Sequence, residues 1–301
     1  MSANTWIVVA GDPAIGALIE TARALGGQVT AAVVGPRAVA DTIAAGGVDK
    51  VVWFGDPDQA PVEAYASAVA DAVGAAPGVV LAASRPGDRV LLGAVAARLQ
   101  AAVLTEPSSV SADGDALVVT RTVFGGIAVE TVSVTGPVAL VLDGGPVPPA
   151  SGEAPVEEVA ATPLGMTVVE TKDNSFELVD LGAADRVVSI GRGLKAQADL
   201  AMIEALAGAC KAEVACSRPV AEGLGWLGKD RYIGVSGQKI APDVYFAIGI
   251  SGQLQHMVGV RGAKIIVAIN SDANALVFKD ADYCLVGDLY QLVPALTKAL
   301  K

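Results

Sequence analysis

Residues 244–259 read VYFAIGISGQLQHMVG, and this stretch decides how the second half of the chain folds. Val244 to Ile248 are β-branched, aromatic or small apolar residues, which is typical of a buried strand in a parallel sheet. Gly249 ends the strand, a tight turn capped by Ser251 is expected next, and a helix should run from Gln253 to Met257. A strand that feeds a helix through glycines gathers free backbone N–H groups at a helix N-terminus. Such a point suits a phosphate.

His256 lies on that helix and is the only histidine among the 301 residues. In a regular helix its side chain would face the same ligand as the turn. Two interpretations stay open at this point. A glycine turn after a strand is common in α/β folds, and a single histidine near a helix start is more often a hydrogen-bonded structural residue than a ligand contact.

The composition is typical of an α/β protein that binds no nucleic acid and is not inserted in a membrane. Hydrophobic residues make up 52% of the chain and aromatic residues only 4%, so the core must consist of small aliphatic side chains. A formal net charge of −11 leaves no basic stripe to neutralise nucleic-acid phosphates. Apolar runs such as Val79 to Ala83 are far shorter than the ~20 residues of a membrane span, and the N-terminus lacks a signal-peptide pattern. We therefore expect a cytoplasmic protein.

The cysteines do not indicate a metal site. Cys210, Cys216 and Cys284 are odd in number and have no metal-type spacing such as C-x-x-C. We expect all three to be small core residues and the protein to carry no metal.

The first half of the chain predicts a doubly wound α/β domain. Strand and helix patterns alternate from Trp6 to Leu99, as in a sheet of parallel strands with helices on both faces. From Ala116 to Leu142 strand patterns follow one another without helices, so antiparallel strands are expected to extend that sheet. Residues 143–163 are rich in Pro, Gly, Ala and Glu, which predicts a linker. The expected domains are therefore 1–163 and 164–301.

The second domain predicts a further parallel sheet, with Met166 to Glu170 as a possible strand before it. Its opening strand leads into residues 191–196, GRGLKA, which match the G-x-G-x-x-A dinucleotide fingerprint in weak form. The acidic residue that an NAD site needs after the next strand is missing. In open α/β sheets ligands bind at the carboxyl ends of the strands. The polar side chains expected at that rim are Arg192, Ser217, Arg218, Ser251, Asn270 and Asp288.

With these residues assembled, the second half resembles the α subunit of electron transfer flavoproteins, the subunit that holds FAD. The matching motifs, in the order in which the family has them, are GRGLK (191–195), ACSR (215–218), GVSG (234–237), APDVY (241–245), GISGQLQH (249–256), AIN (268–270), ADY (281–283) and VGDL (286–289). The sequence around Cys216 and His256 is most similar to that of the FixB-like branch, which is associated with nitrogen fixation and carnitine metabolism. The first half matches this family in architecture, but its sequence motifs match less well.

The resemblance implies a role for each matched position. The phosphates and ribityl chain of FAD are expected to meet Arg192, Ser251, Gly252, Gln253, Leu254 and Gln255. The adenosine end is expected to meet Asn270 and Asp288. For the redox role, the expected residues are Arg218 over the flavin ring, Ser236 near its N5 and His256 near its O2. The remaining expected FAD contacts are Ser217, Ile233, Gly234 and Val235.

Three places depart from many relatives of that family. Residues 235–238 read VSGQ where relatives carry QTGK, and the serine keeps a hydroxyl at the N5 position. Residues 271–273 read SDA in place of KDP, which weakens the prediction for the adenosine side. Tyr232 stands where several relatives carry glutamine, so its contact is not assigned.

The function that the resemblance implies is an electron carrier. FAD would take electrons from a dehydrogenase, such as an acyl-CoA dehydrogenase, and pass them to an acceptor such as a quinone oxidoreductase, in a heterodimer with a β subunit. The alternatives are a pyridine-nucleotide-dependent oxidoreductase that uses residues 191–196, and a nucleotide-binding module without redox chemistry. An enzyme with its own substrate should carry a general acid or base beside the cofactor. The only histidine is already assigned to the flavin ring.

Overall fold

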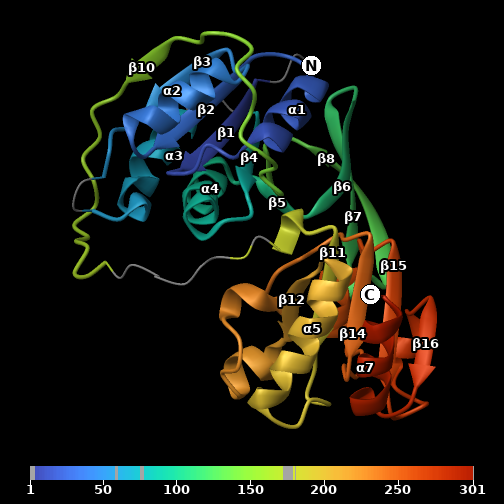
Figure 1. The fold of residues 1–301 in the computed structure, drawn as a ribbon. Coiled ribbons are helices and arrows are strands. Elements are labelled where there is room, and N and C mark those ends of the chain that lie inside the picture. The colour runs from blue at the N-terminus through green and yellow to red at the C-terminus, as the bar shows by residue number, and fades with distance from the viewer. Residues whose placement is uncertain (1–3, 58–59, 75–77, 172–178, 180, 301) are drawn as a thin grey trace. The chain divides into compact units, whose positions relative to one another are not determined.

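The computed structural model describes residues 4–57, 60–74, 78–171, 179 and 181–300, and the chain divides into two compact units (Figure 1). The units are Met1–Lys172 and Asp173–Lys301. The sequence placed the boundary earlier, after Pro163. In the described ranges, no helix combines the length and the apolar character needed to cross a membrane.

A seven-stranded sheet, entirely parallel, forms the centre of the first unit, in the order β10-β3-β2-β1-β4-β9-β5. Helices α1 and α2 pack on one face and α3 and α4 on the other, which confirms the doubly wound prediction. The strands are β1 (Thr5–Ala10), β2 (Val29–Val34), β3 (Lys50–Trp53), β4 (Val79–Ala83), β5 (Ala102–Thr105), β9 (Val138–Leu142) and β10 (Val156–Glu158). The helices are α1 (Gly16–Leu25), α2 (Arg37–Ala45), the 3₁₀ turn η1 (Val62–Tyr65), α3 (Ala66–Gly74) and α4 (Pro86–Leu99).

The expectation that antiparallel strands extend this sheet is wrong. β6 (Pro107–Asp113), β7 (Ala116–Val123) and β8 (Ala128–Thr135) form a separate three-stranded antiparallel sheet, with the turn η2 (Phe124–Gly126) in its second hairpin. β9 instead joins the main sheet, parallel to both β4 and β5. Burial explains the difference. β8 alternates half-buried and exposed residues, as in a sheet with one covered face, whereas four of the five residues of β9 are buried.

Part of the predicted linker is also structured. β10 lies within residues 143–163 and pairs with β3 as a parallel edge strand. Just before it, the N–H groups of Ser151 and Ala154 donate to carbonyls at the end of α2, so this segment is tied to the unit. The strand expected at Met166 to Glu170 is wrong: those residues have no regular structure, and Val169 is 97% exposed. Without a neighbouring strand the apolar pattern alone does not form a sheet.

The second unit is a six-stranded parallel sheet in the order β13-β12-β11-β14-β15-β16. The order reverses between β11 and β14, and such a switch point opens a crevice at the carboxyl ends of the two strands. The strands are β11 (Arg186–Ile190), β12 (Glu213–Ser217), β13 (Tyr232–Ile233), β14 (Val244–Ile248), β15 (Ile265–Asn270) and β16 (Tyr283–Val286). The helices are α5 (Leu200–Cys210), α6 (Leu254–Met257) and α7 (Leu289–Ala299). Shorter helical segments are the 3₁₀ turns η3 (Leu181–Ala183), η4 (Gln197–Asp199), η6 (Lys229–Arg231), η7 (Val258–Val260) and η8 (Leu276–Lys279), and the short π-helix η5 (Pro219–Gly223).

β14 is buried on both faces, as its composition predicts. Phe246 and Ile248 pack with α5 and α7 on one face of the sheet, whereas Tyr245 and Ala247 pack with α6 and η8 on the other. This alternation puts Tyr245 directly beneath α6.

The prediction that all three cysteines are core residues is wrong for one of them. Cys210 and Cys216 are buried, but Cys284 is exposed. It lies on β16, whose four residues are all exposed and which forms the edge of its sheet.

Candidate functional site

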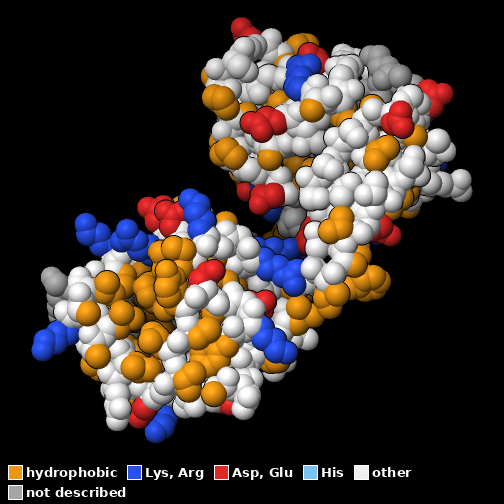
Figure 2. Space-filling view, turned by 90° about the vertical axis from the view of Figure 1, so that its right-hand side faces the viewer, with side chains coloured by type: hydrophobic (Ala, Val, Ile, Leu, Met, Phe, Trp, Pro, Cys, Tyr) orange, Lys and Arg blue, Asp and Glu red, His pale blue; other side chains and the backbone are white. Residues whose placement is uncertain are grey.

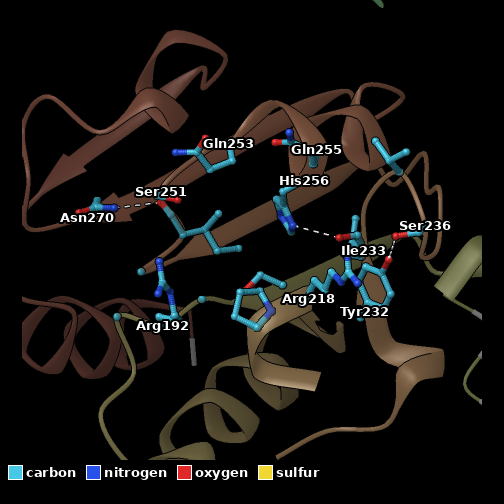
Figure 3. Close-up of a pocket in the computed structure, with 17 residues that line it drawn as sticks. Arg192, Arg218, Tyr232, Ile233, Ser236, Ser251, Gln253, Gln255, His256 and Asn270 are labelled. Atoms are coloured by element: carbon cyan, nitrogen blue, oxygen red, sulfur yellow. Dashed lines mark hydrogen bonds between the residues drawn. The ribbon is translucent and has the colours of Figure 1, made fainter. Parts of the chain in front are cut away.

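A cavity of about 790 Å³ opens at the switch point of the second unit (Figure 3). Its walls come from the residues that follow β11, β12, β13 and β14, together with the end of β15. The predicted site residues that line it are Arg192, Ser217, Arg218, Ile233, Val235, Ser236, Ser251, Gln253, Gln255, His256 and Asn270. The folded sheet thus brings together side chains that lie far apart in the sequence.

Two glycine turns form the floor between β11 and β14. The N–H of Gly193 donates to the carbonyl of Gly249 across 3.1 Å, and a Cβ on Gly193 would lie 2.7 Å from the Cα of Gly249. A Cβ on Gly191 would overlap the Gly249 carbonyl, and Gly249 itself has φ +62°. Glycine is required on both sides because the two backbones touch. Close packing therefore accounts for the G-x-G pattern at 191–193.

The turn after β14 offers open hydrogen-bond donors. Within the described residues, the backbone N–H groups of Ser251, Gly252 and Gln253 donate to no protein acceptor. Arg192, on the turn after β11, is exposed and has no carboxylate partner among the residues that the structure describes. Free N–H groups beside an unpaired guanidinium suit the oxygen atoms of a phosphate.

The expected cap of the following helix is wrong. α6 begins at Leu254, and its N-cap is Gln253, whose side chain makes no capping hydrogen bond. Gly252 sets this geometry: its φ is +79°, and a Cβ there would overlap the backbone of Val277. The carbonyl of Ser251 accepts the N–H of Val277 across 3.1 Å, so the turn is held by η8 and needs no side-chain cap.

His256 lies against the cavity with only 7% of its surface exposed. Its Nδ1 is 3.1 Å from the carbonyl oxygen of Ile233, as Figure 3 shows, and its Nε2 is 2.6 Å from the hydroxyl of Tyr245. Burial lowers the pKa of His256 to about 4, an effect that the Ile233 carbonyl opposes. The imidazole is therefore neutral at physiological pH, and both ring nitrogens have partners within the protein.

Ser236 lies at the other end of this wall, in a turn built around Tyr232. The hydroxyl groups of the two residues are hydrogen-bonded (Figure 3). The N–H of Gln238 donates to the Tyr232 carbonyl across 2.8 Å and closes the turn. Gly234, with φ +149°, lets the turn approach α6, since a Cβ would be 2.7 Å from the carbonyl oxygen of Gln255.

Arg218 lines the cavity at the carboxyl end of β12, but its guanidinium is already paired. Its Nε donates to Oε2 of Glu222, four residues later, across 2.6 Å. This hydrogen bond raises the pKa of Arg218 and lowers that of Glu222. The Arg218 side chain is 65% exposed, so water screens the pair.

Asn270 uses both ends of its amide to shape the rim. Its Nδ2 donates to the Ile250 carbonyl across 2.9 Å, and its Oδ1 accepts the N–H of Asp272 across 2.9 Å. Asp288 lies outside the cavity, where its carboxylate accepts the N–H of Tyr290 and caps α7. The other expected residues outside the cavity lining are Gly234, Gly252 and Leu254.

Six residues that line the cavity were not predicted from the sequence as site residues. Tyr232 was noted only as a departure from relatives, and its 5% exposure and contact with Ser236 make it a wall of the site. The others are Gly191, Gly193, Pro219, Gly249 and Ile250. The sequence did indicate that each of these residues belongs to a turn at the end of a strand. Local patterns do not show, however, which atoms of such a turn face a cavity.

The residues present fit FAD. The cavity volume lies within the roughly 300–1,000 Å³ of cofactor pockets, and donors for an anion lie at the Ser251 turn beside Arg192. Away from them the wall is formed by Ile233, Val235 and the packed ring of Tyr232, which suits a flat ring system. The site can therefore hold a molecule with phosphates at one end and an aromatic ring at the other.

Comparisons with known proteins agree with this geometry. Residues 180–261 match the family model of the electron transfer flavoprotein FAD-binding domain, and residues 11–164 match that of the electron transfer flavoprotein domain. The chain is 36% identical over 306 aligned positions to Protein FixB of Escherichia coli O157:H7, covering 99% of this chain and 98% of the relative. Protein FixB of Shigella flexneri is similar to the same extent.

Proposed function

Because the chain belongs to the electron transfer flavoprotein α-subunit family, in its FixB-like branch, and binds FAD, we propose that it is the FAD-holding subunit of a heterodimeric electron carrier. In this role FAD accepts electrons from a dehydrogenase, such as an acyl-CoA dehydrogenase, and passes them to an acceptor such as a quinone oxidoreductase. The protein is then a carrier without a small-molecule substrate of its own.

The cavity at the β11–β14 switch point is the observation that carries this proposal. Arg192 and the open N–H groups from Ser251 to Gln253 are assigned to the phosphates. Arg218, Ser236 and His256 are assigned to the flavin ring, since they line the opposite part of the same cavity. The assignment of the adenosine end to Asn270 and Asp288 has less support, because Asp288 lies outside the cavity and caps α7.

A partner subunit is part of the proposal, and the surface of the second unit supports it. Figure 2, which looks onto the side of that unit carrying β16, shows hydrophobic side chains gathered there. Tyr283 is 62% exposed and Val286 55% exposed on the edge strand, and Leu285, Leu276 and Ile265 are each more than a third exposed. An uncovered edge strand with apolar side chains is typical of a surface that a partner covers. We assign this partner as the β subunit.

The enzyme alternative has a weaker basis. A dehydrogenase acting on its own substrate needs a general acid or base within hydrogen-bond reach of that substrate. His256 is neutral, and both of its nitrogens are engaged with Ile233 and Tyr245. The visible spectrum of the protein purified with its β partner separates the carrier from both alternatives: a bleachable flavin absorbance supports the carrier, and a colourless protein supports one of the other two functions.

The decisive experiment measures electron transfer and cofactor content together. The chain is co-expressed with its β partner, and its bound FAD is identified and quantified after release. Arg192→Ala should lower FAD occupancy, whereas Arg261→Ala, an exposed arginine outside this cavity, should leave occupancy unchanged. Reduction of the bound FAD by a dehydrogenase, without consumption of any substrate by the chain alone, is the expected result. Stoichiometric binding of a pyridine nucleotide in place of FAD would contradict the proposal.

A further inference from the structure

Tyr245 lies behind the site and is hydrogen-bonded to one residue of its lining, His256. It is fully buried on β14, with 0% exposure, and it is not part of the cavity lining. Its hydroxyl is 2.6 Å from Nε2 of His256, and the two rings are 6.2 Å apart at an angle of 41°. The phenol therefore meets the histidine from the core of the unit, through a hydrogen bond to Nε2.

The chemistry of the two partners fixes the protonation of the histidine. A carbonyl oxygen can only accept, so Nδ1 must carry the proton that is donated to Ile233. A neutral imidazole has one N–H, so Nε2 must be the acceptor and the Tyr245 O–H the donor. Burial raises the pKa of Tyr245, which keeps its proton on the phenol, and burial lowers the pKa of His256, which keeps a second proton off the imidazole. Only the Nδ1–H form lets the imidazole donate to the Ile233 carbonyl and accept from the Tyr245 hydroxyl at the same time.

The hydrogen bonds also connect three elements of the site wall. His256 belongs to α6, Tyr245 to β14, and the Ile233 carbonyl ends β13. One further bond runs between the same segments, from the N–H of Val235 to the carbonyl of Gln255 across 2.8 Å. The turn that carries Ser236 is thus tied to α6 on both sides of Gly234.

We propose that Tyr245 is a positioning residue of the FAD site: together with the Ile233 carbonyl it holds His256 as its Nδ1–H tautomer, so that no imidazole N–H is left to donate to the flavin. His256 then meets the ring as a neutral, fixed edge, and it ties the Ile233–Ser236 wall to α6. The guanidinium of Arg218, which is hydrogen-bonded to Glu222, lines this part of the cavity as a cationic group. The assignment of the tautomer is independent of FAD, and its consequence for the flavin rests on the proposed function.

Because His256 is the only histidine, its ring nitrogens can be observed without overlap. The full-length chain is labelled with ¹⁵N-histidine, combined with its unlabelled partner subunit, and freed of any histidine tag. A protonated Nδ1 and an unprotonated Nε2 are expected with and without FAD, with no titration between pH 8 and pH 5. An Nε2–H signal in either state would overturn the proposal, even if no variant of Tyr245 folds.

Tyr245→Phe supplies the second measurement, since it keeps the buried ring and removes the donor. The Nε2 resonance should move because the unprotonated nitrogen loses its donor, while the Ile233 carbonyl keeps the proton on Nδ1. FAD should dissociate up to roughly tenfold faster, as expected when a buried acceptor loses its donor. Tyr65→Phe, which removes a phenol hydroxyl from the first unit, is the control and should change none of these. An unchanged histidine spectrum in Tyr245→Phe contradicts the assignment. A chain that never binds FAD would remove the proposed function while leaving the tautomer measurable.

Discussion

The Nε of Arg218 donates to Oε2 of Glu222 across 2.6 Å, from the end of β12 to the first turn beyond it. The same arginine lines the cavity that we assign to FAD. One guanidinium thus has two possible anionic partners, the carboxylate four residues away and the flavin ring. A reduced flavin carries negative charge near N1 and O2, and a fixed arginine would favour that form.

Replacing Arg218 by Ala should lower the reduction potential of the bound FAD, because the positive charge beside the ring is lost. The expected shift is on the order of tens of millivolts. Redox titration of the purified heterodimer measures it, with FAD still held through the Ser251 turn. Glu222→Gln is the matched variant: it releases the guanidinium from its carboxylate and should move the potential in the opposite direction. An unshifted potential in Arg218→Ala would assign the arginine to its ion pair alone.

Tyr232 and Ser236 should act as a coupled pair, since their hydroxyl groups are hydrogen-bonded in the cavity wall. Tyr232→Phe and Ser236→Ala should each weaken FAD binding, and the double variant should lose less than the sum. The coupling expected for one such hydrogen bond is about 0.5–1.5 kcal/mol. FAD titration followed by flavin fluorescence measures all four affinities. Tyr232→Gln, the residue that several relatives carry, tests whether another polar group can replace the phenol. Additive losses would show that the two hydroxyl groups act independently.

Stability should fall as the pH drops from about 6.5 to about 4 through the titration of His256. Its pKa in the folded protein is lowered to about 4, against an ordinary value of 6.5, so the unfolded chain binds the proton first. The contribution of the neutral imidazole to the free energy of unfolding is fully present above pH 6.5 and is lost as the pH falls through about 4. It is at most about 3 kcal/mol. Urea denaturation across this range, compared between the wild type and His256→Asn, isolates the effect because no other histidine titrates. Parallel pH profiles for the two proteins would contradict the burial of a neutral imidazole.

Gly252→Ala should destabilise the second unit and abolish tight FAD binding. Its φ of +79° is strained for alanine, and the added methyl would overlap the backbone of Val277. The expected loss in the free energy of unfolding is at least about 1–3 kcal/mol. Gly208→Ala, on an exposed position of α5 with open space around it, is the control and should stabilise by about 0.5–1 kcal/mol. Thermal unfolding of both variants with and without FAD tests the pair, and equal effects would contradict the packing argument.

The local patterns predicted most of the framework. β14 and the glycine turn after it occur where the sequence placed them, because a continuous apolar run that ends in glycine has few other conformations in an α/β fold. The same logic placed β11, β12 and β15, and with them the strand ends that carry Arg192, Arg218 and Asn270. Parallel strands end at one edge of a sheet, so the convergence of these residues follows from strand order alone.

The placement of some strands and the exposure of some side chains could not be predicted from local patterns, because they depend on which other element covers a residue. β8 and β9 both have strand patterns, yet of the two only β9 lies between two other strands, and Cys284 is exposed because its strand is the sheet edge. Asp288 caps a helix outside the cavity. The sequence by itself determined that His256 follows a glycine turn at the carboxyl end of a strand. Only the tertiary structure decided its protonation, because its partners Tyr245 and Ile233 lie 11 and 23 residues away and meet it through the packing of three separate elements.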